Sequence, residues 1–433
     1  MTQPARRALA AWMVTAMAAG VLLLAPAQAG ATTESSSRGS TVAAGSQRID
    51  PGELQRLLDQ IVAAGAPGAA ARVRDEHGVT QAASGVADLR TGRPMRLGLT
   101  YRAGSVTKPF VATVVLQLVA EGRLTLSDTV ERWLPGILPY GDQVTIRQLL
   151  NHTSGVPDYV IEPLVRLYTF PHGRFRAWRP RELVALIAEQ PPDFPPGTAW
   201  RYSNTGYVLA GMIVQAATGR KLGKELARRI FRPLGLRDTF FPVNRPDIPG
   251  RNARGYSLPL GQEEGPLLDF TVYNPSLAWA AGALVSDLGD LARFFRALLR
   301  GRLLPPRLLA EMTTPVDTGQ PGLGYGLGLV VIETPAGRLI GHDGAIPGFF
   351  NIVLSTEDGR RQLGIMMNEE FATPAVYQAF SQALEAIAIR LLEAAPLGGA
   401  STGLSLRAAV QARQSARTAL ALARAGMAVQ ASR

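Results

Sequence analysis

The chain has 433 residues, of which 46% are hydrophobic and 18% charged, a composition that excludes a disordered protein and fits two lobes or one large domain with an insertion. It has no cysteine, which excludes disulfides and a thiol nucleophile. Of the net charge of +11, the N-terminal arginines supply +2 and the tail after Pro396 supplies +5. The remainder is mildly basic and shows no basic stripe with interleaved aromatic residues, so we expect no nucleic-acid partner.

The N-terminal segment has the features of a secretory signal. Arg6 and Arg7 precede an apolar run from Ala8 to Ala25, and Ala27-Gln28-Ala29 follows it. This order predicts a signal peptide over residues 1–29, cleavage near Ala29 and a secreted, extracellular protein. The alternative is a single membrane anchor, because 18 apolar residues reach the lower limit for a span. The moderate hydrophobicity of the run favours cleavage, so we expect no stable membrane insertion.

Composition divides the remaining chain into three parts. Residues 30–48 are rich in Gly, Ser, Thr and Ala and are expected to form a flexible leader. Residues 49–397 form one expected folded domain, with a helical lobe inserted at approximately 115–320. Residues 398–433 are rich in Ala and Arg and read as a solvated extension; the alternative is a surface-binding helix that adheres weakly to an anionic wall.

Hydrophobic periodicity predicts strands near both ends of the folded part and helices between them. The expected strands are Ala69–Val73, Val79–Val86, Leu327–Glu333, Arg338–Ile340, Phe349–Ser355 and Gln362–Met367. The expected helices are Leu54–Ala64, a helix after Ser105, Thr145–Leu150, Pro180–Glu189, Thr205–Thr218, Lys221–Phe231, Asp287–Leu299 and Pro374–Glu393. This order indicates a sheet built from both ends of the chain, with a helical insertion.

The first chemical motif is Ser105-Val106-Thr107-Lys108. Residues at i and i+3 share a helix face, so the Lys108 amine can reach the Ser105 hydroxyl and act as the base that a serine nucleophile needs. Pro109 is tolerated only near a helix start and therefore puts both residues in the first turn, where the helix dipole favours anionic charge. Alone, this short motif also fits an ordinary surface Ser near a Lys.

The second motif is Tyr202-Ser203-Asn204, in a loop before a predicted helix. A tyrosine beside an ammonium ionises more easily, which makes Tyr202 a candidate base for Ser105 and a later acid for the leaving group. The Asn204 amide can both donate and accept, which suits binding of a substrate amide. The alternative is an interface aromatic and a helix cap.

The third motif is Gly341-His342-Asp343-Gly344-Ala345. Gly344 marks a place where a ligand backbone can come close. His342 could complete the proton network, although a His beside an Asp is more often structural. The backbone N–H groups of Ser105 and Ala345 could together hold the oxyanion of an acyl-transfer transition state.

Together the three motifs, in this order, resemble the serine β-lactamase and penicillin-binding-protein superfamily. The similar group contains class C β-lactamases, Streptomyces-type D-alanyl-D-alanine carboxypeptidases and related esterases, and the likeness runs from about Leu54 to Leu392. The supporting stretches are Leu149–Gly155, Pro196–Thr198 through Gly206-Tyr207, and Tyr325–Gly328.

The resemblance implies an α/β (α+β) fold, with an antiparallel sheet flanked by helices, a helical lobe and an active site in the cleft between them. It makes Ser105 the acylated nucleophile, with Lys108 and Tyr202 handling its proton. It assigns substrate binding to Asn204 and Ala345, places His342 near the leaving group, and makes His152 a structural loop residue. A small-molecule or peptide substrate is implied: a peptidoglycan stem peptide, a β-lactam or an ester.

The sequence departs from this group at the carboxylate-binding position. Members that recognise a free carboxylate usually have Thr where this chain has Asp343, and often an Arg on the preceding strand, where Leu329–Ile332 is apolar. Because like charges repel, the Asp opposes a D-Ala terminus or a β-lactam acid, unless its side chain points away from the cleft.

Three functions are therefore expected, in this order. The first is a D-alanyl-D-alanine carboxypeptidase-like serine hydrolase, the second an esterase or amidase of the same fold acting on neutral substrates, and the third a non-catalytic penicillin-binding or wall-associated protein. No cofactor and no metal are expected, because the four histidines show no ligand spacing. We expect a monomer.

Overall fold

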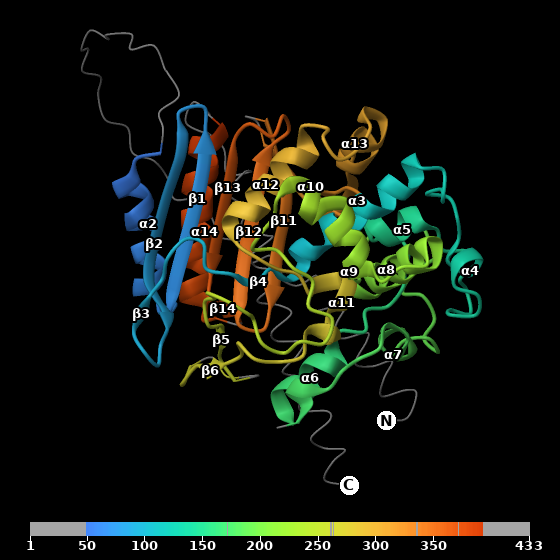
Figure 1. Cartoon of the computed structure of the whole chain (residues 1–433), viewed down its shortest axis with the longest axis horizontal. Coiled ribbons are helices and arrows are strands. Elements are labelled where there is room, and N and C mark those ends of the chain that lie inside the picture. Colours follow the sequence, from blue (N-terminus) through green and yellow to red (C-terminus); the bar gives the residue numbers. More distant parts are fainter. Residues whose placement is uncertain are drawn as a thin grey trace, which may run out of the picture.

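The computed structural model describes residues 49–392, except 171, 260, 261, 263, 335, 336 and 371. The predicted signal peptide, leader and C-terminal extension lie outside the described residues. Within them, the fold is organised around a large antiparallel sheet with helices on both faces (Figure 1).

The sheet joins the two ends of the folded chain. In sheet order its strands are β3 (Arg93–Pro94), β2 (Gly78–Asp88), β1 (Gly68–Asp75), β13 (Gln362–Met367), β12 (Phe349–Thr356), β11 (Gly337–Ile346), β10 (Val330–Thr334), β9 (Leu323–Tyr325) and β8 (Val316–Gln320). The junction is the pairing of β1 with β13, in which Ala69 lies opposite Met367. The predicted α/β fold with an antiparallel sheet is therefore confirmed.

Two helices from opposite ends of the chain cover one face of the sheet. Helix α2 (Pro51–Ala63) starts at Asp50, whose carboxylate accepts the N–H of Glu53, and helix α14 (Pro374–Leu392) lies beside it (Figure 1). Their buried side chains include Leu54, Leu58, Phe380 and Leu384, and these form one apolar core with the sheet.

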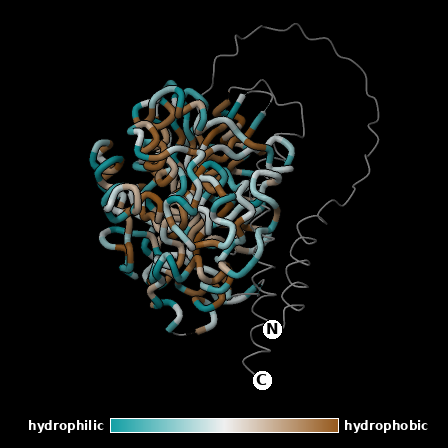
Figure 2. The backbone as a smooth tube through the Cα atoms, turned by 90° about the vertical axis from the view of Figure 1, so that its right-hand side faces the viewer, coloured by the Kyte–Doolittle hydropathy of each residue, from teal (hydrophilic) through white to brown (hydrophobic). Residues whose placement is uncertain are grey.

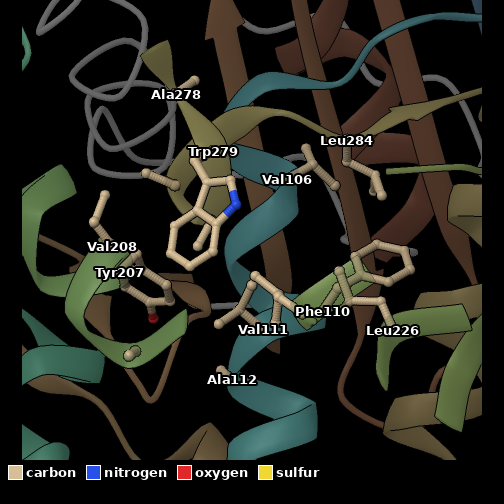
Figure 3. Packing of buried hydrophobic residues seen from close by; sticks show 14 of the residues in the cluster. Val106, Phe110, Val111, Ala112, Tyr207, Val208, Leu226, Ala278, Trp279 and Leu284 are labelled. Carbon is tan, nitrogen blue, oxygen red and sulfur yellow. The ribbon is translucent and has the colours of Figure 1, made fainter. Parts of the chain in front are cut away.

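The helices between the two groups of strands cover the opposite face and surround a second, larger core. The helices are α3 (Thr107–Ala120), α4 (Val130–Trp133), α5 (Ile146–Asn151), α6 (Ile161–Thr169), α7 (Pro180–Ala185), α8 (Asn204–Thr218), α9 (Leu222–Leu226), α10 (Arg232–Leu234), α11 (Trp279–Gly282), α12 (Leu288–Leu299) and α13 (Pro306–Thr313). Apolar side chains of α3, α8, α9 and the Ala278–Leu284 segment meet in this core (Figure 3). Hydrophilic segments lie mainly along the periphery (Figure 2).

Short elements complete the described chain. The 3₁₀ turns are η1 (Gly104–Val106), η2 (Gly173–Phe175) and η4 (Pro275–Leu277), and η3 (Ala227–Phe231) is a π-helical turn. The short strands are β4 (Tyr101–Arg102) with β7 (Val285–Ser286), and β14 (Glu369–Glu370) with β5 (Tyr256–Ser257) and β6 (Leu268–Asp269). Within the described residues no helix combines the length and the hydropathy that a membrane span needs.

Most predicted elements are present within a few residues, but three predicted boundaries are wrong and one predicted helix is partly of another type. The helix expected over Lys221–Phe231 becomes α9 followed by the π-helical turn η3, and α7 ends at Ala185, well before Glu189. Strand β10 begins at Val330 because Gly328 adopts a φ of 83° in a tight turn. Strand β11 continues to Ile346, so the third motif lies inside a strand.

Candidate active site

Ser105 lies in η1, the 3₁₀ turn that leads into α3. Gly104 has a φ of 56°, and a Cβ built there would lie 3.0 Å from the backbone nitrogen of Ala345, so this position requires glycine. The Thr107 hydroxyl donates to the Gly104 carbonyl (2.7 Å) and accepts the Leu284 N–H (3.0 Å). These contacts hold Ser105 at the start of α3, with 5% of its surface exposed.

Lys108 is fully buried, and its amine has three oxygen neighbours. Its Nζ lies 3.1 Å from the Ser105 Oγ, 2.8 Å from the Asn204 Oδ1 and 2.8 Å from the Ala281 carbonyl oxygen in α11. The predicted contact between the amine and the serine hydroxyl is therefore present. This distance suits transfer of the serine proton to a neutral amine.

Tyr202 lies against Lys108 and His152. The Lys108 Nζ is 4.7 Å from the centroid of the Tyr202 ring, and the His152 ring centroid is 4.3 Å from it on a tilted plane. His152 has a φ of 65°, and its Nδ1 accepts the Ser203 N–H at 3.1 Å, so the proton of the neutral ring is on Nε2. Burial, followed by the charge of Lys108, lowers the pKa of His152 well below 6.5.

Asn204, at the start of α8, links Lys108 to Asp158. Its Oδ1 accepts from Lys108, and its Nδ2 donates to the Asp158 Oδ2 at 2.8 Å. Burial raises the pKa of Asp158 above 3.8, against the opposing effect of hydrogen bonds from Val160 and Asn204. Asp158 is not among the residues that the sequence singled out.

The third motif begins at Gly341, the last residue of β11 that pairs with β10, and continues along the strand beyond this pairing. His342 is fully buried, and its Nδ1 lies 2.5 Å from the Asp343 carbonyl oxygen, so Nδ1 carries the proton. Its Nε2 lies 2.8 Å from the Tyr325 hydroxyl, which therefore donates to it. The Asp343 carboxylate is 3.5 Å from the His342 Nδ1, and 15% of its side chain is exposed.

The backbone of β11 packs closely against η1. A Cβ on Gly344 would lie 2.0 Å from the Ala103 carbonyl oxygen, so no side chain fits at this contact. Asn351 is fully buried, and its Nδ2 donates to the carbonyls of Gly344 (3.0 Å) and Ala103 (3.3 Å). This contact places the backbone of Ala345 beside Gly104, the residue that precedes the serine.

The structure thus brings the three distant motifs together at the start of α3, with the predicted residues Ser105, Lys108, Tyr202, Asn204, Gly344 and Ala345 around one point. It places His342 differently from the expected proton network, since its ring nitrogens contact Tyr325 and the backbone of Asp343. Sequence reasoning missed Asp158, Asn351 and the Ala281 carbonyl as parts of this site. Asp158 lies three residues after the Leu149–Gly155 stretch that resembles the family, and this proximity is the one sequence feature that points to it.

The chain belongs to the Beta-lactamase family, whose sequence pattern matches residues 54–387. It is accordingly a serine hydrolase, as the sequence predicts. Among curated proteins it is 32% identical over 306 residues to penicillin-binding protein 4* of Bacillus subtilis (66% of this chain and 64% of that protein). It is 33% identical over 284 residues to esterase EstB of Burkholderia gladioli (59% of this chain and 72% of that protein).

The fold and sequence are also similar to a solved D-stereospecific amidohydrolase from Streptomyces sp. The two share 40% sequence identity with a TM-score of 0.69, and the match covers 76% of this chain and 98% of that structure. Relatives with the same fold therefore carry the names of a penicillin-binding protein, an esterase and an amidohydrolase. The chain matches less than two thirds of the length of the B. subtilis protein.

Proposed function

We propose that this protein is a secreted serine amidase or esterase that forms an acyl-enzyme at Ser105 and cleaves small amides and esters whose leaving group bears no carboxylate. Amides of D-amino acids are the first substrates to consider, because the D-stereospecific amidohydrolase is 40% identical. The second expected function, rather than the first, is thus the one that we favour.

The proposed reaction uses the contacts of Ser105 directly. Lys108 takes the proton from the Ser105 Oγ as this oxygen attacks the substrate carbonyl. The backbone N–H groups of Ser105 and Ala345 bind the oxyanion, and loss of one such donor typically costs about 2.7–4 kcal/mol. Tyr202, whose ring lies beside the amine, gives its phenolic proton to the leaving group and takes the proton held by Lys108 in exchange. Water then attacks the acyl group; its proton passes to Lys108, and the released Ser105 oxygen is protonated in turn.

The observation that carries the specificity is the position of Asp343. Its carboxylate lies 3.5 Å from the Nδ1 of the neighbouring His342 and its side chain is 15% exposed, on the strand that packs against η1. Leu329, Val331 and Ile332, where family members often supply an arginine, are buried and apolar. A negative charge here opposes a substrate carboxylate and leaves neutral leaving groups unaffected.

The test is a substrate panel for the purified full chain. It compares D-phenylalanine amide, L-phenylalanine amide, p-nitrophenyl acetate and a D-Ala-D-Ala peptide, with Ser105→Ala as the control. We expect turnover of the amide or ester, abolished by Ser105→Ala, and slow or absent release of D-alanine. Preferential release of D-alanine from the peptide would overturn the proposal.

A D-alanyl-D-alanine carboxypeptidase-like enzyme is the second candidate, and the similarity to penicillin-binding protein 4* favours it. It requires a fluorescent penicillin to label Ser105, as shown by intact mass and lost in Ser105→Ala. Absence of turnover over the whole panel would instead support the non-catalytic alternative. Export is tested separately, by N-terminal sequencing of the protein in the culture medium, where a start next to Ala29 is expected.

A further inference from the structure

We infer that Asp158 is a positioning residue that fixes the orientation of the Asn204 side-chain amide, so that its oxygen rather than its nitrogen faces Lys108. In this arrangement the Lys108 amine keeps its lone pair for the Ser105 proton. The inference rests on the proposed acylation of Ser105 and deepens it, by assigning a residue that controls the base through a neighbour.

The orientation of Asn204 follows from the chemistry of its neighbours. The amide lies between the Asp158 Oδ2 and the Lys108 Nζ, each 2.8 Å away. An ionised carboxylate can only accept hydrogen bonds, so the amide must direct its NH₂ group toward Asp158. The carbonyl oxygen of Asn204 then necessarily faces Lys108.

Asp158 is itself held firmly enough to impose this orientation. Its Oδ1 accepts the Val160 N–H at 3.2 Å, so both carboxylate oxygens have a donor. The surrounding backbone is fixed to the start of α8: the Thr205 hydroxyl donates to the Pro157 carbonyl (2.6 Å) and accepts the Tyr159 N–H (3.1 Å). The carboxylate and the amide that it orients are therefore anchored to the same helix end.

The consequence appears in the hydrogen bonds of Lys108. The charged form of Lys108 can donate to all three oxygens, whereas the neutral form that accepts the serine proton has two N–H donors and one lone pair. The Asn204 Oδ1 and the Ala281 carbonyl can take the two donors, which leaves the lone pair for the Ser105 hydroxyl at 3.1 Å. With the Asn204 amide reversed, its NH₂ would donate to that lone pair and compete with the serine proton.

The isosteric variant Asp158→Asn tests this directly. The Val160 N–H requires an oxygen at the Oδ1 position, so the new NH₂ group must face Asn204. Asn204 then reverses to present its oxygen, and its nitrogen turns toward Lys108. We expect kcat/KM for a p-nitrophenyl ester to fall by about 10²-fold, the lower range for loss of a general base. KM should change little.

The double variant Asp158→Asn/Asn204→Asp exchanges donor and acceptor between the two positions and again presents an oxygen to Lys108. We expect it to recover at least about tenfold of the lost rate, the recovery being partial because a carboxylate holds the amine's proton more tightly. The single variant Asn204→Asp completes the cycle and should be impaired, because it sets two carboxylates in contact.

Asp193→Asn is the matched control. The Asp193 carboxylate pairs with Arg201, the residue before Tyr202, at 2.8 Å. Because partly exposed ion pairs contribute little, loss of this pair should leave kcat/KM within about twofold of the wild type.

The second readout is the rate at which a fluorophosphonate labels Ser105, measured by intact mass, with thermal unfolding of every variant recorded. Wild-type labelling in Asp158→Asn, or a double variant no faster than Asn204→Asp alone, would overturn the inference. If Asp158→Asn does not fold, the comparison between the double variant and Asn204→Asp still decides. If the wild type hydrolyses no amide or ester but is labelled, the proposed function fails while the order of the labelling rates still tests Asp158.

Discussion

At the scale of single residues, Asp343 is the side chain that we expect to select against substrates with a carboxylate. Replacing it by Thr, the residue usual in carboxylate-binding relatives, removes a negative charge 3.5 Å from the His342 ring. We expect Asp343→Thr to raise the rate of Ser105 labelling by a fluorescent penicillin by about tenfold, equivalent to about 1.4 kcal/mol. Turnover of a neutral ester should change little, and equal labelling of the two proteins would contradict the repulsion.

A second prediction at the residue scale concerns His152 and the free energy of unfolding at acidic pH. The folded protein keeps this buried histidine neutral, with its pKa well below 6.5, whereas the unfolded chain protonates it near 6.5. The unfolded state therefore binds more protons as the pH falls below 6.5, and the free energy of unfolding decreases. Asn tolerates the positive φ of 65° and does not titrate.

We expect His152→Asn to be less stable than the wild type at pH 7.5, by about 0.5–3 kcal/mol, because the smaller side chain loses the ring contacts with Tyr202 and Tyr325, although its Oδ1 can still accept the Ser203 N–H. Between pH 6.5 and 5, however, its stability should decline less steeply than that of the wild type. Urea unfolding at several pH values measures both quantities. Parallel pH profiles would show that His152 does not contribute to the acid limb.

Elements are joined by buried charge as well as by apolar packing, and Glu225 of α9 is the clearest case. Its carboxylate is fully buried and accepts from Arg228 (2.8 Å) and Arg229 (2.7 Å), and Arg229 also bridges to Glu121 at the end of α3. Burial alone would raise the pKa of Glu225, but the arginines outweigh it and lower the pKa to about 2.

Because the folded pKa lies below the ordinary 4.5, Glu225 contributes stability that is fully present above pH 4.5 and is lost as the pH falls toward about 2. We expect Glu225→Gln to lower the free energy of unfolding by about 3 kcal/mol at pH 7, the lower range for breaking a buried pair. The difference from the wild type should shrink below pH 4. A difference independent of pH would show that packing, not charge, dominates at this position.

At the scale of elements, the sequence predicts what periodicity and local chemistry control. Strands β1 and β2 and helix α14 follow from alternating or helical apolar patterns, and the turn between β1 and β2 follows from its Asp, Glu and Gly residues. Periodicity does not reveal the π-helical turn η3, because Ala227–Phe231 keeps a helical pattern. The extension of β11 through His342 was missed because glycines weaken a strand pattern.

The site was predictable to a different degree from the fold. The contact between Ser105 and Lys108 follows from their spacing, but the meeting of Tyr202 and Ala345 with them depends on family resemblance, since no local pattern relates residues so far apart. Asp158 is 46 residues from Asn204, in a segment whose composition indicates only a turn. A contact of this range requires the folded structure.

In the whole molecule, the reactive residues lie against only one of the two apolar cores that cover the sheet. The sheet carries two cores: one beneath α2 and α14, and one among the helices that include α3. Ser105 and Lys108 lie on the side of the second core, because η1 and α3 pack against that core. Mutations of equal size in the two cores should therefore differ in their effect on catalysis.

Phe380 and Phe110 form a matched pair for this comparison, since both are fully buried. Phe380 of α14 packs against Phe350, with ring centroids 5.0 Å apart. Phe110, two residues after Lys108 in α3, stacks on Phe294 with ring centroids 3.6 Å apart. Each change to Ala should lower the free energy of unfolding by about 3–5 kcal/mol.

Under conditions in which both variants are folded, we expect only Phe110→Ala to reduce kcat/KM. A cavity beside the first turn of α3 lets Lys108 move relative to Ser105, and displacement of about 1 Å at a reacting group can cost about 10²-fold. Phe380→Ala removes packing from the opposite face of the sheet, so the geometry at η1 and β11 should persist. Steady-state kinetics on the same ester, paired with urea unfolding, separates the two effects. Equal loss of activity in both variants would mean that the sheet transmits the disturbance, and that the layers are not independent.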